Sequence, residues 1–133
     1  MLAATTGAHS GAIEAAMTPA DLQRAQRLVR RMPIAERVVD AILQIVRSAR
    51  PLDGASDRVR DFVGWGPGPR ASQALSLAAR ARALIDGRKA PSLEDVLFLA
   101  KPVLRHRMAL NFSARAQGVE IDGFIDEIVA KSV

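Results

Sequence analysis

Apolar residues recur at helical spacing through most of the chain after residue 18. In the first such stretch, Thr18 can cap a helix whose first residue is Pro19. The apolar positions that follow are Leu22, Ala25, Val29 and Met32, and arginines occupy the other faces. The pattern predicts an amphipathic helix that stops near Pro33.

The rest of the chain also has helical periodicity. Apolar stripes predict a broadly buried helix over 34–50, a short element over 57–63, a helix over 70–86 ended by Gly87, a capped helix from Ser92 that Pro102 kinks or restarts, and a last short helix around 124–129. No alternation of apolar and polar residues is long enough to predict a strand. The sequence therefore predicts an all-α fold, a small helical bundle spanning 18–133.

The first 17 residues differ from the rest. They consist mainly of alanine, threonine and glycine with no sustained period, which predicts a flexible leader over 1–17. His9 stands alone in this leader, and a metal site needs several converging donors. We therefore predict no metal ligand there.

The composition is typical of one soluble globular domain. The chain has 133 residues, of which 49% are hydrophobic and 25% are charged, and it contains no cysteine. A disulfide framework and a thiolate metal site are therefore excluded, and a reducing, cytoplasmic setting is expected. No apolar run approaches the roughly 20 residues that span a bilayer, so we expect no membrane segment.

A net charge of +5 could indicate a nucleic-acid partner. The 19 basic residues, only three of them lysines, are however spread over every segment with acids between them. One Trp, four Phe and no Tyr leave few side chains for stacking on bases. We expect no specific nucleic-acid binding, and DNA binding is the least favoured of three functional hypotheses.

The segment from Trp65 to Ala71 places an arginine, Arg70, in the first turn of a helix after a glycine-rich approach. A cation at that end opposes the helix dipole by about 0.3 to 1 kcal/mol, and a bound anion would offset this cost. Helix amides plus a guanidinium make a phosphate-binding arrangement. Alternatively, Arg70 points into solvent or pairs with an acid.

The residues that a nucleotide hydrolase requires are missing. The Lys131-Ser132 pair follows Ala130 rather than glycine, and no glycine loop between a strand and a helix precedes it. No pair of acids follows an apolar strand to hold magnesium. We therefore predict no ATP hydrolysis by this chain alone.

Three blocks of the sequence resemble a known family. They are LVRRMPIAERVVDAILQIVRSARP, VRDFVGWGPGPRASQALSLAARARALIDGR and LEDVLFLAKPVLRHRMALNF. In this order and spacing they resemble the C-terminal lid of the MoxR family of AAA+ ATPases, from about Thr18 to the end of the chain. The resemblance implies a helical lid that closes over ATP bound to a preceding α/β module, in a ring that is usually a hexamer.

The resemblance also implies roles for single residues. Arg70 aligns with the sensor 2 arginine, which reaches the γ-phosphate and would be catalytic in the full-length protein. The positions implied to lie near the nucleotide are Gly66, Gly68, Pro69 and Ala71. The form of the motif best known to us has serine at the position of Gly68, so a capping hydroxyl is absent here. Arg105 and Arg107 are implied to lie near a neighbouring subunit, although a solvated basic turn is the alternative.

For the full-length protein, the resemblance implies ATP and Mg as cofactors and a chaperone-like role in assembling or maturing partner complexes. The implied partners are the α/β module, neighbouring ring subunits and von Willebrand A domain proteins. The whole nucleotide-binding module cannot be mapped onto this chain. A stand-alone helical interaction module that binds a partner protein or an ATPase ring is therefore the second hypothesis, and an in-frame Walker A motif upstream would distinguish the two.

Two further features have ordinary structural interpretations. Trp65 is predicted to be a packing anchor between the loop and the bundle, with contact to a nucleotide base as the alternative. The three acids Asp53, Asp57 and Asp61 are spaced for one helix face but have arginines beside them. We predict solvated ion pairs there and no metal site.

Overall fold

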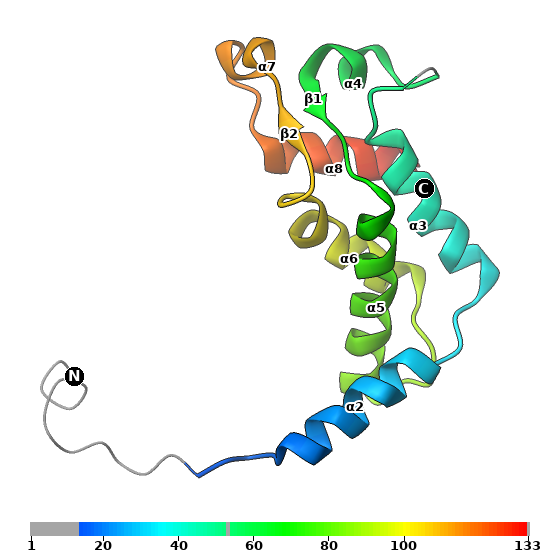
Figure 1. Ribbon diagram of the computed structural model, residues 1–133. Coiled ribbons are helices and arrows are strands. Elements are labelled where there is room, and N and C mark those ends of the chain that lie inside the picture. The colour runs from blue at the N-terminus through cyan, green and yellow to red at the C-terminus, as the bar shows by residue number, and fades with distance from the viewer. Residues whose placement is uncertain (1–13, 53, 133) are drawn as a thin grey trace, which may run out of the picture.

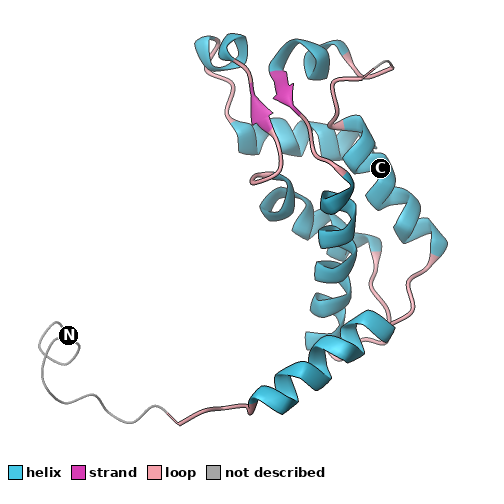
Figure 2. Cartoon of the chain, in the orientation of Figure 1, coloured by secondary structure: helices cyan, strands magenta, loops and turns pink. Residues whose placement is uncertain are grey.

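The computed structural model describes residues 14–52 and 54–132, and it is built from helices with one very small sheet (Figures 1 and 2). The elements in chain order are α2 (Pro19–Arg31), α3 (Glu36–Ser48), α4 (Asp57–Phe62), β1 (Val63–Trp65), α5 (Pro69–Ile85), α6 (Leu93–Leu104), β2 (Ala109–Leu110), α7 (Phe112–Ala116) and α8 (Ile121–Ser132). This order confirms the predicted helical fold class. The predicted leader falls mostly, and His9 entirely, outside the described residues.

The core lies where α3, α5, α6 and α8 pack against one another. Ile45 of α3, Leu75 of α5 and Ile125 of α8 are fully buried in one apolar cluster. The side of α5 that faces this cluster also carries the buried alanines Ala71 and Ala79. Their small side chains let α3 and α6 approach α5 closely. In the described part of the chain, no helix is long and apolar enough to cross a membrane.

Helix α2 lies apart from this core, across the C-terminal end of α5 (Figure 1). Its start is as predicted, because Thr18 and Asp21 form a reciprocal capping box. None of its 13 residues is buried, and Leu22 and Leu28 are each about half exposed. Only Met32, which caps its C-terminal end, is buried. The amphipathic pattern therefore predicts the helix correctly, although the helix adds little to the core.

The two strands were not predicted. They pair antiparallel, with Val63 opposite Leu110 and Trp65 opposite Ala109, and the register shifts between the two pairs. Asn111 extends the connection, because its backbone N–H donates to Phe62 O at 2.8 Å. Strands of three and two residues are too short to show any alternation, so sequence periodicity could not reveal them.

The helix ends follow local rules in most places. Gly87 ends α5 with a positive φ of 72°, and the N–H groups of Gly87 and Arg88 donate to the last free carbonyls of the helix. Pro102, however, lies inside α6, which continues to Leu104 as one helix. Of the two predicted alternatives, a kink or a restart of the helix at Pro102, the restart is therefore wrong.

Candidate functional site

The loop between β1 and α5 is held firmly against the end of α3. A Cβ atom on Gly66 would lie 2.9 Å from Arg50 Cα, 2.9 Å from Pro51 Cδ and 3.0 Å from Ala49 O. Only glycine fits such a close approach to backbone and ring atoms. The next residue, Pro67, is fully buried. The chain therefore enters α5 along a fixed path.

Arg70 is the second residue of α5 and is exposed to solvent. Within residues 14–52 and 54–132, the Arg70 side chain forms no hydrogen bond and no ion pair, whereas several other arginines do. The first turn of α5 contains no acid. The structure therefore excludes the alternative that Arg70 pairs with an acid. The alternative that Arg70 points into solvent remains beside phosphate binding. A free guanidinium lies beside the positive end of a 17-residue helix.

The other residues of the loop differ in what they expose. Gly68 is the N-cap of α5, with φ −89° and ψ −175°, and it supplies no side-chain cap. Pro69 occupies the first helical position and is exposed. Ala71 is fully buried, and its N–H already donates to Gly68 O at 2.9 Å. The Ala71 side chain therefore belongs to the core and faces away from solvent.

Trp65 does not anchor the loop. Its side chain is 62% exposed at the end of β1, so the prediction of a packing anchor is wrong. Gly66 and Pro67 fix the loop instead, by close backbone approach and by burial. The sequence could not reveal this, because an apolar residue beside glycines can point either way.

Arg105 and Arg107 both have partners inside the chain. Arg105 Nε donates to Asp122 Oδ1 at 2.6 Å, and its Nη2 pairs with the second oxygen of the same carboxylate. This hydrogen-bonded guanidinium lowers the pKa of Asp122 below its usual value. Arg107 Nη1 donates to the carbonyl of Val103 at 2.9 Å, near the end of α6. Arg105 remains exposed and Arg107 is half-buried, on the side where α6 meets α8.

The two described acidic residues of α4 are exposed to solvent, and one of them, Asp57, forms the predicted ion pair. Asp57 pairs with Arg60 one turn later and is 85% exposed, and Asp61 is exposed as well. Asp53 lies outside the described residues. Across 14–52 and 54–132, no group of three or more His, Cys, Asp or Glu side chains could hold a metal ion.

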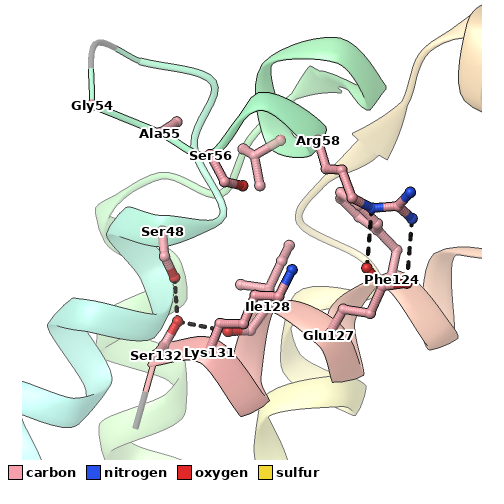
Figure 3. Close-up of a pocket in the computed structure, with 11 residues that line it drawn as sticks. Ser48, Gly54, Ala55, Ser56, Arg58, Phe124, Glu127, Ile128, Lys131 and Ser132 are labelled. Carbon is pink, nitrogen blue, oxygen red and sulfur yellow. Dashed lines mark hydrogen bonds and ion pairs between the residues drawn. The ribbon is translucent and has the colours of Figure 1, made fainter.

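An apolar hollow of about 180 Å³ lies between the end of α3, the start of α4 and the end of α8 (Figure 3). At its rim Ser48 Oγ and Ser132 Oγ lie 2.6 Å apart, and Arg58 pairs with Glu127 at 3.2 Å. It shares no residue with the loop before Arg70. Ligand sites usually enclose about 300 to 1,000 Å³, so this hollow is smaller than a typical binding site.

A buried carboxylate, Asp95, is the strongest electrostatic feature that sequence reasoning missed. Both terminal nitrogens of Arg88 donate to its oxygens at 2.6 Å, and Ser92 N donates to it at 2.8 Å. These donors, with Arg88 first, hold the pKa of Asp95 far below its usual range. Arg82 adds an ion pair at 3.4 Å while its guanidinium stacks on Phe98 at 3.6 Å. Asp86 at the end of α5 also pairs with both arginines, at 2.9 Å with Arg88 and 3.9 Å with Arg82. The cluster ties α5 to α6 and is structural, because its two arginines are matched by two carboxylates.

Comparison with known proteins adds to this geometry. The AAA lid domain family matches residues 55–128. Chaperone MoxR1 of Mycobacterium tuberculosis is 30% identical over 114 residues, which are 85% of this chain and 30% of MoxR1. The uncharacterized protein YeaC of Bacillus subtilis is 30% identical over 105 residues, which are 79% of this chain and 30% of YeaC.

A crystal structure with a similar fold has also been determined. A protein from Cytophaga hutchinsonii, described as a "putative ATPase", superposes with a TM-score of 0.77 at 25% identity. The superposition covers 86% of this chain and 34% of that protein. The chain therefore spans about a third of the length of each of these relatives.

Proposed function

Because the chain belongs to the AAA lid domain family and is homologous to MoxR-type ATPases, we propose that it is the nucleotide-sensing lid of such an enzyme. In this proposal Arg70 is the sensor 2 arginine. It reaches the γ-phosphate of an ATP molecule bound to an α/β module that precedes the lid. The lid thereby couples the state of the nucleotide to the position of the helical bundle.

The observation that carries this proposal is the free guanidinium of Arg70 at the start of α5. A cation there opposes the helix dipole, and no acid in the described chain offsets it. A phosphate group would interact favourably with both the guanidinium and the helix end. The close approach of Gly66 and the burial of Pro67 fix the backbone that leads to Arg70 before a nucleotide arrives, which reduces the backbone entropy lost on binding.

These residues fit one part of ATP. The Arg70 guanidinium would bind the terminal phosphate, on which charge develops during phosphoryl transfer, and Gly68 and Pro69 would lie beside it. Mg has no ligand set in the described residues, so in this proposal the α/β module supplies its ligands. The lid alone therefore binds nucleotide weakly and does not hydrolyse it.

For the full-length protein we propose a cytoplasmic ring with a chaperone-like role in assembling partner complexes, including von Willebrand A domain proteins. In such a ring the turn that contains Arg105 and Arg107 would face a neighbouring subunit. The exposed pair of Arg105 and Asp122 supports this, since it presents a fixed polar surface without excess charge. A charge-neutral pair of this kind suits a contact that opens and closes.

The test is substitution of Arg70 by alanine in the full-length ATPase. We expect a loss of ATP turnover of about 100-fold or more, because preorganised cations near the γ-phosphate contribute several kcal/mol to the transition state. The matched control is Arg47→Ala, which removes an exposed arginine of α3 that has no partner in the described chain. The free energy of unfolding of the 133-residue chain should change by less than about 0.5 kcal/mol in both variants. Wild-type turnover in a folded Arg70→Ala enzyme would show that the sensor assignment is wrong.

A further inference from the structure

The outward face of α2 concentrates positive charge. At 100° per residue, Arg24, Arg27, Arg30 and Arg31 all lie on the side opposite Ala25 and Val29. Ala25 and Val29 are half-buried, whereas the four arginines are exposed. Our expectation that arginines alternate with acids therefore does not hold on this helix.

Most of this charge is unmatched. Arg24 pairs with Asp21 at 3.2 Å, and Asp21 is the helix's one acid. The side chains of Arg27, Arg30 and Arg31 have no ion pair with any other described residue. Like charges three and four residues apart destabilise a helix, and this helix buries no residue to compensate. Such a local violation is expected where a surface serves a partner.

Apolar surface accompanies the charge. Leu28 is 51% exposed, and it lines a shallow hollow together with the four arginines. Arg24 precedes Leu28 by four residues and Arg31 follows it by three, so both arginines flank the leucine on the helix surface. The face thus presents an apolar spot between two cations.

We propose that this arginine face, formed by Arg24, Arg27, Arg30 and Arg31 with Leu28, is a docking surface for an acidic protein. The partner that it fits carries an apolar side chain between carboxylates, so that both the leucine and the guanidinium groups are covered. Arginine suits this role because its planar fork binds carboxylates through two hydrogen bonds.

A nucleic acid fits the same face less well. Three unpaired arginines would neutralise only about three phosphates, and binding would be weak and easily removed by salt. The helix has no aromatic side chain for stacking on bases, and Leu28 has no counterpart on a phosphate backbone. The combination of apolar and cationic surface favours a protein.

The arginine face is also remote from the proposed nucleotide site. It lies at the C-terminal end of α5, whereas Arg70 lies at the N-terminal end of the same helix (Figure 1). A helix of 17 residues is about 25 Å long. Docking on α2 therefore leaves Arg70 accessible, and the proposal does not depend on the sensor assignment.

The experiment measures binding of the 133-residue chain to three fluorescent probes by anisotropy. The first probe is a helical peptide in which each leucine has glutamates four residues before it and three residues after it. The second is the same peptide with glutamine in place of leucine, and the third is a short DNA duplex. We expect the first peptide to bind about fivefold more tightly than the second, and more tightly than the DNA at physiological salt.

Two triple variants that each remove three positive charges locate the binding site of the peptide. The triple variant Arg27→Gln, Arg30→Gln, Arg31→Gln should weaken binding of the first peptide by about tenfold or more. The control variant Arg37→Gln, Arg47→Gln, Arg115→Gln removes three exposed arginines elsewhere. It should change the affinity for the first peptide by less than about twofold. Leu28→Gln should remove the preference for the leucine-containing peptide. Circular dichroism should show that all variants remain helical.

Three results would overturn the proposal. They are equal loss of binding in the two triple variants, no binding of the leucine-containing peptide, and tighter binding of DNA than of this peptide that depends on Arg27, Arg30 and Arg31. The last result would assign the face to nucleic acid. A variant that loses its helical signal would be replaced by the single substitutions Arg27→Gln and Arg31→Gln, for which the same comparison applies.

Discussion

Arg88 donates hydrogen bonds from both terminal guanidinium nitrogens to the two carboxylate oxygens of Asp95, each at 2.6 Å. Asp95 is also the residue whose carboxylate caps the first turn of α6 through Ser92. One side chain thus completes a helix cap and fixes the turn that follows α5. Asp95 is 1% exposed, so water cannot replace either partner.

Replacing Asp95 by asparagine should destabilise the fold by about 2 to 3 kcal/mol, because a charge-assisted bidentate contact is lost and Arg88 is left without its main partner. Urea denaturation measures this free energy of unfolding. The control is Asp126→Asn, which removes an exposed partner of Lys101 and should change stability by less than about 0.5 kcal/mol. Equal effects of the two substitutions would contradict a special role for Asp95.

Acid should weaken the fold through the same carboxylate. Arg88 holds the pKa of Asp95 far below the value of about 3.9 expected in the unfolded chain. A depressed pKa stabilises the folded state above pH 4, and this contribution is lost as pH falls further, since the unfolded chain then binds the proton first. The free energy of unfolding should therefore fall between about pH 5 and pH 2, and less steeply in Asp95→Asn. Identical pH profiles would show that other carboxylates dominate.

Gly66→Ala should destabilise the protein by about 1 to 3 kcal/mol, since the new methyl group would lie 2.9 Å from Arg50 Cα and Pro51 Cδ. Thermal unfolding followed by circular dichroism gives the difference in stability between the variant and the wild-type chain. Gly68→Ala in the same loop is the matched control, because nothing lies within 4 Å of its Cβ position. If Gly66→Ala were no more harmful than Gly68→Ala, the loop would not be fixed by its contact with the end of α3.

Gly68→Ser should stabilise the chain by a few tenths of a kcal/mol. The backbone at this N-cap is extended, and the space around it is open, so the serine hydroxyl can accept a hydrogen bond from the first turn of α5. Chemical denaturation of the variant and of the wild-type chain measures this difference in the free energy of unfolding. A loss of stability would mean that the start of α5 differs from the described geometry.

Sequence reasoning succeeded where a local rule decides the structure. The capping residues Thr18 and Ser92, Pro69 at a first helical position and Gly87 after a last turn each mark a helix end through contacts within a few residues. The helical class and the placement of Arg70 in a first turn follow from the same short-range signals.

It failed where the outcome depends on residues far apart in the chain. Val63 pairs with Leu110, 47 positions later, and neither short strand has a pattern of its own. Neither the exposure of Trp65 nor the close approach of Gly66 to Arg50 is described by a spacing rule. The helical pattern did place the arginines of α2 on its polar faces, but it could not predict that most of them lack an acidic partner from the rest of the described chain.

The exposure of Trp65 gives the protein a fluorescent reporter of its own. The chain contains one tryptophan and no tyrosine, so all indole emission comes from the start of the loop that leads to Arg70. In the isolated chain this indole is already in water, and unfolding should shift its emission only slightly. Any surface that covers the loop, such as a nucleotide or a closing α/β module, should shift the emission to shorter wavelength or quench it. The lid closure that we propose for the full-length protein can thus be tested in real time without a label wherever the added module contributes no tryptophan.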